Sequence, residues 1–137
     1  DELVFLDLDA TPNSRKPMAS IIRKAAEEIF MPMTIGGGVQ SLDDFRLMLE
    51  NGADKVAINT AAIETPTLIT EASERFGAQC VVVSIDFKQD EQGKYSVWTR
   101  CGKEQTPLDP VEWAQKVEEL GAGELMLTSI DRDGTRK

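Results

Sequence analysis

The sequence contains no histidine and only two cysteines in 137 residues. Without histidine, a Ser-His or Cys-His catalytic system and a histidine-ligated zinc site are both excluded. Cys80 and Cys101 lie far apart, and Cys80 opens the apolar segment "CVVVSID", which favours packing in a buried strand. Any chemistry must therefore use carboxylates, lysine, threonine, asparagine and backbone groups, and we expect neither a cofactor nor a metal.

Long apolar runs and an excess of positive charge are also missing. No segment approaches the roughly 20 apolar residues of a membrane-spanning helix, and no basic leader precedes an apolar core. The net charge of −9 argues against a non-specific nucleic-acid binder. We expect a cytoplasmic protein, with no membrane or nucleic-acid partner and one domain large enough to bury a core.

Short apolar segments alternate with amphipathic helical patterns along the whole chain. This alternation predicts a parallel β-sheet covered by helices. The expected strands are Glu2–Leu8, Pro32–Ile35, Lys55–Asn59, Cys80–Asp86 and Glu124–Ile130. The expected helices are Ser14–Glu28, Ser41–Glu50, Pro66–Arg75 and Pro110–Leu120.

One segment, Phe87–Thr106, interrupts this rhythm just after an expected strand. Its polar turn around Gly93 and the alternating "YSVWT" predict a β-hairpin. Loops that follow the carboxyl ends of strands carry function in α/β proteins, so the hairpin borders a candidate site.

Every second residue of the expected strands follows a common pattern. Three of the four series begin with a charge and three end with a polar group; they are Glu2-Val4-Leu6, Lys55-Ala57-Asn59, Val82-Ser84-Asp86 and Glu124-Met126-Thr128. If these faces point into one barrel, charges ring its bottom and hydrogen-bonding groups ring its top. From the residues alone, solvated charges at strand starts explain the lower ring better.

Polar residues also gather at the carboxyl ends of the strands, where barrels and open α/β sheets place their active sites. They are Asn59 with Thr60, Asp86, Thr128 and the segment "DRDGT" at 131–135. A buried carboxylate such as Asp86 is costly unless it is paired or catalytic. It could instead cap the hairpin or hold Lys88.

Three consecutive glycines, Gly36, Gly37 and Gly38, separate an expected strand from a helix in "TIGGGVQSLDDF". Backbone N–H groups without side chains at such a position form an anion cradle, and a phosphate fits between this turn and Asn59-Thr60. A tight turn explains the glycines equally well.

Longer segments carry a family resemblance. "TIGGGVQSLDDFRLMLENGADKVAINTAA", "VVVSIDFK" and "GAGELMLTSIDRDGT" resemble the cyclase subunit of imidazole glycerol phosphate synthase, from histidine biosynthesis. The resemblance implies one incomplete (βα)8 barrel domain over residues 1–137, with family strands two to six, four helices and a hairpin insertion at 87–106. The family's first, seventh and eighth strands have no counterpart, so we expect this chain alone to be inactive.

The resemblance also implies a reaction. In that family, ammonia from a partner glutaminase passes through the barrel and reacts with a phosphoribulosyl-formimino-aminoimidazole carboxamide ribonucleotide. The products are imidazole glycerol phosphate and aminoimidazole carboxamide ribotide. Two aspartates provide acid–base catalysis; Asp86 matches one, and the other belongs to the absent first strand.

Further site residues follow from the resemblance alone. Gly38, Asn59 and Thr60 match residues that hold one substrate phosphate, and Gly37 gives the ligand room to approach. Gly134 belongs to the second phosphate site, and Thr128 and Asp133 match polar groups near the middle of the substrate. Cys101 stands where relatives often have serine. At the barrel bottom, Glu2, Lys55 and Glu124 match a salt-bridged ammonia gate, and Asp54 matches a residue that faces the glutaminase.

Two alternatives remain open at this stage. Five parallel strands cannot close such a barrel, so the chain could be a self-associating, phosphate-binding scaffold, and we expect a homo-oligomer. The chain could also belong to the sister phosphoribosyl isomerase of the same pathway. The segment "ADKVAINT" and the hairpin after Asp86 argue against the isomerase.

Overall fold

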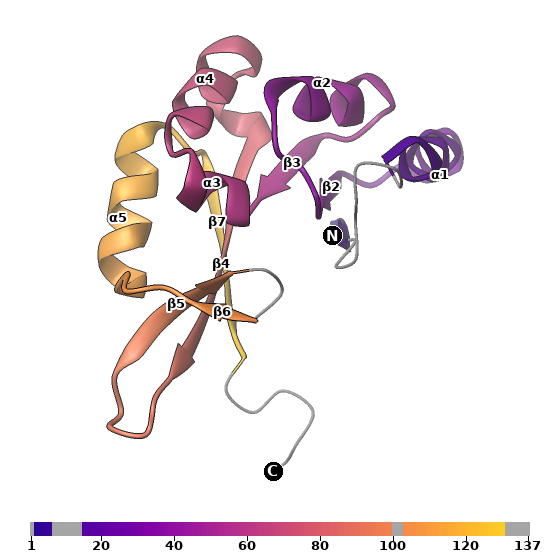
Figure 1. Ribbon diagram of the computed structural model, residues 1–137. Coiled ribbons are helices and arrows are strands. Elements are labelled where there is room, and N and C mark those ends of the chain that lie inside the picture. Colours follow the sequence, from indigo (N-terminus) through magenta and orange to yellow (C-terminus); the bar gives the residue numbers. More distant parts are fainter. Residues whose placement is uncertain (1, 7–14, 100–102, 131–137) are drawn as a thin grey trace.

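A curved mixed sheet with helices packed along it forms the fold of this computed structural model (Figure 1). The structure describes residues 2–6, 15–99 and 103–130. Among these residues the strands are β1 (Leu3–Leu6), β2 (Met33–Gly36), β3 (Lys55–Ile58), β4 (Val81–Gln89), β5 (Tyr95–Thr99), β6 (Glu104–Gln105) and β7 (Glu124–Ser129). Parallel pairing joins β1 to β2, β2 to β3, β3 to β4 and β4 to β7. The predicted parallel sheet is therefore confirmed, and its shape is that of part of a barrel.

The register places the alternate residues of neighbouring strands on one common face. Following the partners from β1 to β7 gives one row of paired Cα atoms: Leu6, Gly36, Ala57, Val82 and Glu124. Side chains at every second position share a face of a strand, so the series selected from the sequence lie together. The row runs from the last residue of β1 to the first residue of β7, which is the stagger of strands in a barrel.

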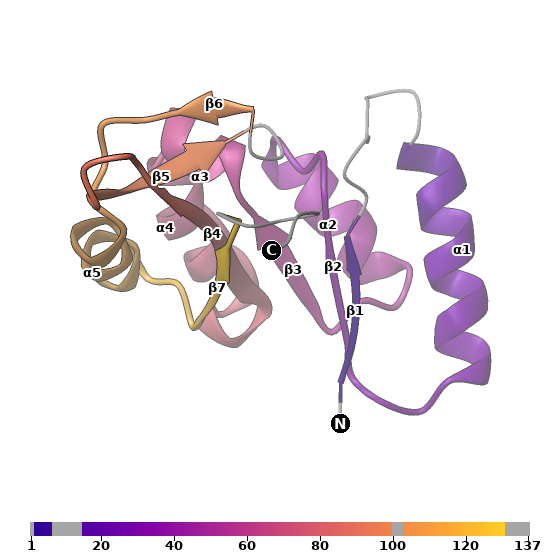
Figure 2. The ribbon, with the colours of Figure 1, turned by 90° about the horizontal axis from the view of Figure 1, so that it is seen from below.

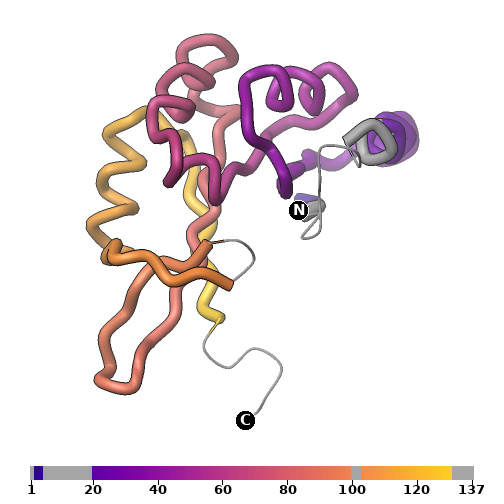
Figure 3. The backbone as a smooth tube through the Cα atoms, in the orientation of Figure 1, coloured from indigo at the N-terminus to yellow at the C-terminus, as the bar shows by residue number. Residues whose placement is uncertain are grey.

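Strand β4 changes its partner along one edge. Val81–Val83 pairs with β3 in parallel, and Asp86–Gln89 pairs with β5 in antiparallel fashion. The turn that joins β4 to β5 is fixed by Asp90. Its Oδ1 accepts hydrogen bonds from the backbone N–H groups of Gln92 and Lys94, both at 2.9 Å. The paired strands extend away from the helices, as the tube in Figure 3 shows. Antiparallel pairing therefore begins at Asp86 itself.

The described residues contain five α-helices: α1 (Arg15–Glu28), α2 (Leu42–Glu50), α3 (Thr60–Glu64), α4 (Thr67–Phe76) and α5 (Pro110–Leu120). The expectation of four helices was wrong, because α3 is a single short turn of "TAAIE". It has no room for a visible 3.6-residue period, and its alanines pack in the core.

Cys80 was also misplaced: it is half-buried in the 3-10 turn Ala78–Cys80, directly before β4.

Local sequence signals fix the ends of the helices that flank the site. The Ser41 hydroxyl accepts a hydrogen bond from Asp44 N at 3.2 Å and starts α2. Asp109 caps α5 in the same way, with Pro110 in the first turn. Figure 2 shows α1, α2, α4 and α5 following one another along the sheet. They bury the apolar face of the strands, and Phe45 stacks on Phe76 at 5.3 Å between α2 and α4.

Large apolar side chains remain exposed at the outer strands of the sheet. Val4 in β1 is 44% exposed, and Leu125 and Leu127 in β7 are 37% and 58% exposed. In the part of the chain that is described, no helix is long and apolar enough to cross a membrane.

Candidate functional site

The carboxyl ends of β3 and β4 bring two predicted site residues into direct contact. Asn59 follows β3, and its Nδ2 donates a hydrogen bond to Oδ2 of Asp86 in β4 at 3.1 Å. Thr128 in β7 is the parallel partner of Asp86 on the opposite edge of β4. The strand ends therefore surround this carboxylate with neutral polar groups.

Burial raises the pKa of Asp86 above its ordinary value of 3.8, because its charged form loses hydration. The hydrogen bond from Asn59 lowers this pKa, but its effect is smaller than that of burial. Lys88 does not offset the burial, because its ammonium lies over the Trp98 ring, 4.6 Å from the ring centroid. The idea that Asp86 is there to hold Lys88 is therefore wrong for this structure. A carboxyl group that keeps its proton more strongly than usual is suited to acid–base chemistry.

The side-chain oxygen of Asn59, unlike its side-chain nitrogen, has no hydrogen-bond partner among the described residues. This atom, Oδ1, is also buried. A buried acceptor without a partner costs free energy, so an N–H or O–H group of a ligand at this point would be stabilised. A fully ionised phosphate has no hydrogen to donate, so this atom selects for a donor group.

The glycine turn after β2 has the backbone that the anion-cradle hypothesis needs. Gly37 and Gly38 have φ angles of 100° and 71°, which side-chain-bearing residues rarely adopt. The chain then enters α2 through Gln40, whose N–H donates to Asp44 Oδ2 at 2.9 Å. Thr60 begins α3, directly after Asn59. The turn and Asn59-Thr60 thus follow the adjacent parallel strands β2 and β3, at the same edge of the sheet.

Of the other residues predicted at the carboxyl ends of the strands, the structure describes only Thr128. The Thr128 side chain is exposed on β7, next to Asp86 in register. Asp133, Gly134 and Cys101 lie outside the described residues.

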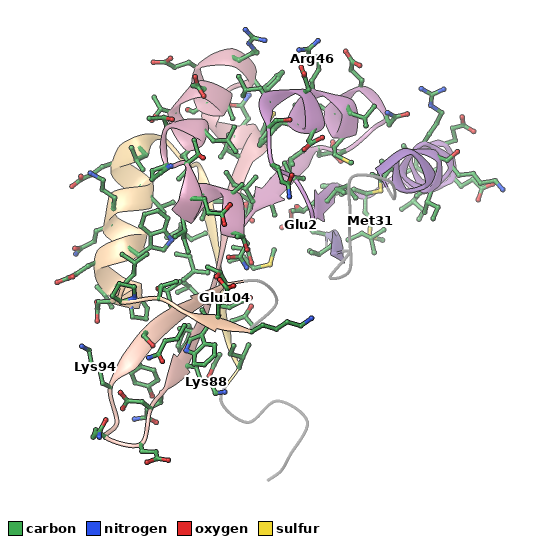
Figure 4. The ribbon with its side chains drawn as sticks, viewed as in Figure 1. Glu2, Met31, Arg46, Lys88, Lys94 and Glu104 are labelled. Carbon is green, nitrogen blue, oxygen red and sulfur yellow. The ribbon has the colours of Figure 1, made fainter. Side chains whose placement is uncertain are left out.

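At the opposite end of the strands, three predicted charges form one cluster. Lys55 Nζ contacts Glu2 Oε1 at 3.1 Å and Glu124 Oε1 at 2.7 Å. These hydrogen bonds, led by that of Glu124, raise the pKa of Lys55 above 10.5. Glu2, labelled in Figure 4, precedes β1, and the other two residues begin β3 and β7. The charges therefore join three strand starts that are far apart in the sequence.

Asp54 lies beside this cluster on an exposed apolar surface. Its Oδ2 accepts a hydrogen bond from Met33 N at 2.7 Å, which fixes the start of β2. Phe30 is 97% exposed and Met31 is 42% exposed. With Asp54 they line a hollow of about 280 Å³, and exposed apolar patches of this kind mark interaction surfaces.

Sequence reasoning missed one residue and one contact at the upper end. The residue is Trp98, the direct antiparallel partner of Asp86, and the contact is the hydrogen bond from Asn59 to Asp86. Pairing the hairpin across its turn at Asp90–Gly93 would have located Trp98. Within the described ranges, no group of three or more histidine, cysteine or acidic residues could hold a metal ion.

Comparisons with known proteins find a family model and a curated relative that match the chain. The family model described as "Histidine biosynthesis protein" matches residues 1–137. The chain is 48% identical to a curated relative from Methanopyrus kandleri, imidazole glycerol phosphate synthase subunit HisF, across its whole length. It covers 57% of that relative, and so spans little more than half of its length.

Proposed function

The chain belongs to the histidine biosynthesis protein family, and from that premise we propose that it forms strands two to six of the cyclase subunit of imidazole glycerol phosphate synthase. In this assignment β1, β2, β3, β4 and β7 are the family strands, and the pair β4–β5 is the hairpin insertion. The similarity to the HisF relative supports the assignment.

The observation that supports it best is the separation of two polar groups at opposite ends of the same strands. The Lys55 cluster lies at the amino ends and the Asn59–Asp86 pair at the carboxyl ends. A channel for ammonia needs an entrance that is distant from the reacting carboxylate. Ala57 and Val82, which are small, apolar and buried, lie between the amino and carboxyl ends of these strands.

Asp86 acts as one acid–base group of the cyclisation. Because burial raises its pKa, this carboxyl group binds a proton more strongly than an ordinary aspartate, which suits it to giving a proton to a leaving nitrogen and later recovering it. Asn59 fixes the orientation of this carboxyl group through one N–H. Its Oδ1 accepts an N–H or O–H of the substrate, which is a ribonucleotide rich in both.

One substrate phosphate binds at the turn after β2. Gly37 and Gly38 carry no side chains, so an anion can approach the backbone of this turn closely, and Asn59 and Thr60 close the site with the backbone at the start of α3. Asp133 and Gly134 complete the substrate site, with Thr128 at its middle.

The glutaminase partner docks at the amino ends of the strands. Asp54, Phe30 and Met31 provide a polar and an apolar contact beside the Lys55 cluster. Lys55, held by Glu2 and Glu124, is the gate through which ammonia enters.

The proposal is tested by completing the barrel. The chain is joined to the segments of the Methanopyrus kandleri relative that it lacks, and the product is assayed with ammonia and the cyclase substrate. We expect turnover, and a loss of at least about 100-fold in Asp86→Asn. Turnover of the isomerase substrate alone would assign the chain to the sister enzyme. The unmodified chain, assayed in parallel, is expected to be inactive because groups that act as a unit lose nearly all activity when divided.

A second role, self-association, is favoured by the exposed apolar residues of the outer strands. Leu125 and Leu127 expose 37% and 58% of their surface on β7, and Val4 exposes 44% on β1. Unpaired strand edges with apolar side chains pair with other chains. Light scattering is expected to give a dimer or larger species, and a monodisperse monomer contradicts this role.

A further inference from the structure

The β4–β5 pair places an indole ring directly beside Asp86. Asp86 is the antiparallel partner of Trp98, and Lys88 is the partner of Ser96. Directly opposed residues, and residues two apart on one strand, point to the same face, so Asp86, Lys88 and Trp98 share a face. The other face is occupied separately: Phe87 contacts Tyr95 edge-on at 5.7 Å, and Val97 is fully buried.

Lys88 has two possible partners on this face. Its Cα lies about 7 Å from that of Asp86 by the rise of an extended strand, which is within reach of a lysine side chain. Its ammonium instead lies 4.6 Å from the centroid of the Trp98 ring. Such a contact is worth about 0.5–1 kcal/mol at exposed sites and more where water is excluded.

We propose that Trp98 is a positioning residue that holds the Lys88 ammonium away from the Asp86 carboxyl group. An ammonium next to a carboxylate favours the charged form and lowers its proton affinity. With Lys88 held on the ring, its ammonium does not lower the proton affinity of Asp86. This inference rests on the proposed acid–base role of Asp86.

Among the described residues around Asp86, Lys88 is the cation that can reach its carboxyl group. Asn59 faces Asp86 from the end of β3, and Thr128 lies beside it on β7; both are neutral. Lys55 and Glu124 stand at the opposite ends of β3 and β7 and pair with each other. Gln105, the β6 partner of Trp98, is neutral and donates to Ser96 Oγ at 3.1 Å.

The space around Lys88 allows the ammonium to move. A hollow of about 230 Å³ is lined by Lys88, Ser96, Trp98 and Gln105, with Asp90 and Glu91 at the turn. Asp90 and Glu91 are exposed, so an ion pair with either is screened by water. If the ring is removed, the half-buried Asp86 is the partner that Lys88 gains most by approaching.

The test is a carboxyl ¹³C NMR titration of Asp86 in the intact chain. The signal assigned to the Asp86 carboxyl carbon reports the ionisation of that group directly. Trp98→Leu is expected to lower the pKa of Asp86 beyond the fitting error. Lys88→Met is expected to leave it unchanged, and the double variant is expected to return to the wild-type value.

Any of three titration results would overturn the proposal. One is an unchanged pKa in Trp98→Leu. Another is an equal shift in Trp98→Leu and in the double variant, because the effect is then independent of Lys88. A change in Lys88→Met alone also contradicts it, since the ammonium then already acts on Asp86.

A second measurement needs no variant that risks unfolding. In the wild-type chain, the Hε protons of Lys88 are expected upfield of those of Lys94, an exposed lysine at the hairpin turn that Figure 4 labels with Lys88. Trp98→Phe retains a ring and is expected to keep part of this shift. Equal Hε shifts for Lys88 and Lys94 overturn the proposal. If the completed barrel is active and Asp86→Asn inactivates it while these tests fail, only the role of Trp98 is lost.

Discussion

Asn59 and Asp86 come from adjacent parallel strands and are joined by one hydrogen bond of 3.1 Å, from Nδ2 to Oδ2. The bond stabilises the carboxylate, while burial of the same group favours its protonated form. The proton affinity of Asp86 is therefore set by two opposed effects, of which burial is the larger.

The first prediction concerns Asn59, the hydrogen-bond donor to Asp86. Asn59→Ala removes the bond that stabilises the carboxylate, so the pKa of Asp86 is expected to rise further. Asn59→Asp is expected to raise it more, because two carboxylates compete for one proton. Carboxyl NMR titration measures both. Asn51→Ala, at the end of α2, is the control, and a lowered pKa in Asn59→Ala contradicts the assignment.

The second prediction concerns stability and pH. The folded chain holds the Asp86 proton more strongly than the unfolded chain, so this group stabilises the fold below pH 3.8. That contribution is lost as the pH rises through the raised pKa. Asp86→Asn is therefore expected to raise the melting temperature more above the raised pKa than near pH 3. A lower melting temperature for the variant above the raised pKa contradicts the burial argument.

The third prediction concerns the glycine turn. Gly37→Ala places a side chain at a φ of 100°, at a cost of about 1–2 kcal/mol. Inorganic phosphate is expected to shift the amide NMR signals of Gly38, Asn59 and Thr60 in the wild-type chain, and Gly37→Ala is expected to abolish these shifts. Gly93→Ala is the matched control, because Gly93 also has positive φ (86°) but lies in the hairpin turn. It is expected to lose comparable stability and keep the phosphate shifts. Equal loss of these shifts in both variants would assign them to instability.

The fourth prediction concerns the Lys55 cluster. Lys55→Met is expected to cost about 1 kcal/mol or less, because all three side chains are partly exposed. The pKa of Lys55 is raised, so its contribution persists below pH 10.5 and is lost as the pH rises through the raised value. Urea unfolding of wild type and variant should therefore converge at strongly alkaline pH, and also in 1 M salt. Lys94→Met, on the hairpin, serves as the control. A difference that persists in high salt contradicts the ion-pair account.

The fifth prediction concerns the partner surface. Phe30 is 97% exposed, so Phe30→Ser is expected to change stability by less than about 0.5 kcal/mol. It is nevertheless expected to weaken binding of the glutaminase to the completed barrel, measured by calorimetry. Val111→Ser, on the exposed surface of α5, is the control because it lies on another element and is 65% exposed. Unchanged affinity in Phe30→Ser argues against docking at this surface.

The strand alternation could be predicted because its period is a property of the backbone. Every-second-residue spacing gives Glu2, Lys55 and Glu124 equivalent positions at strand starts. The family resemblance implies that they form salt bridges, and the structure joins them. The contact of Asn59 with Asp86 could not be predicted, because side-chain rotamers are set by tertiary packing. Helix α3 was missed because one turn has no period to read. Trp98 escaped notice because its position depends on the pairing across the hairpin turn.

The change of partner along β4 has a consequence for the order of folding. One edge of β4 is held by β3 and then by β5, and its other edge pairs with β7 from Val82 to Phe87. The β4–β5 pair closes a short loop and can form early, whereas β7 must return across the hairpin and α5. The hairpin thus offers β7 a preformed template. Backbone amides of Val82–Val83 and Asp86–Phe87, where β4 is paired on both edges, should be among the last to exchange with deuterium. Those of β1, which pairs with β2 alone in the described part of the chain, should be among the first.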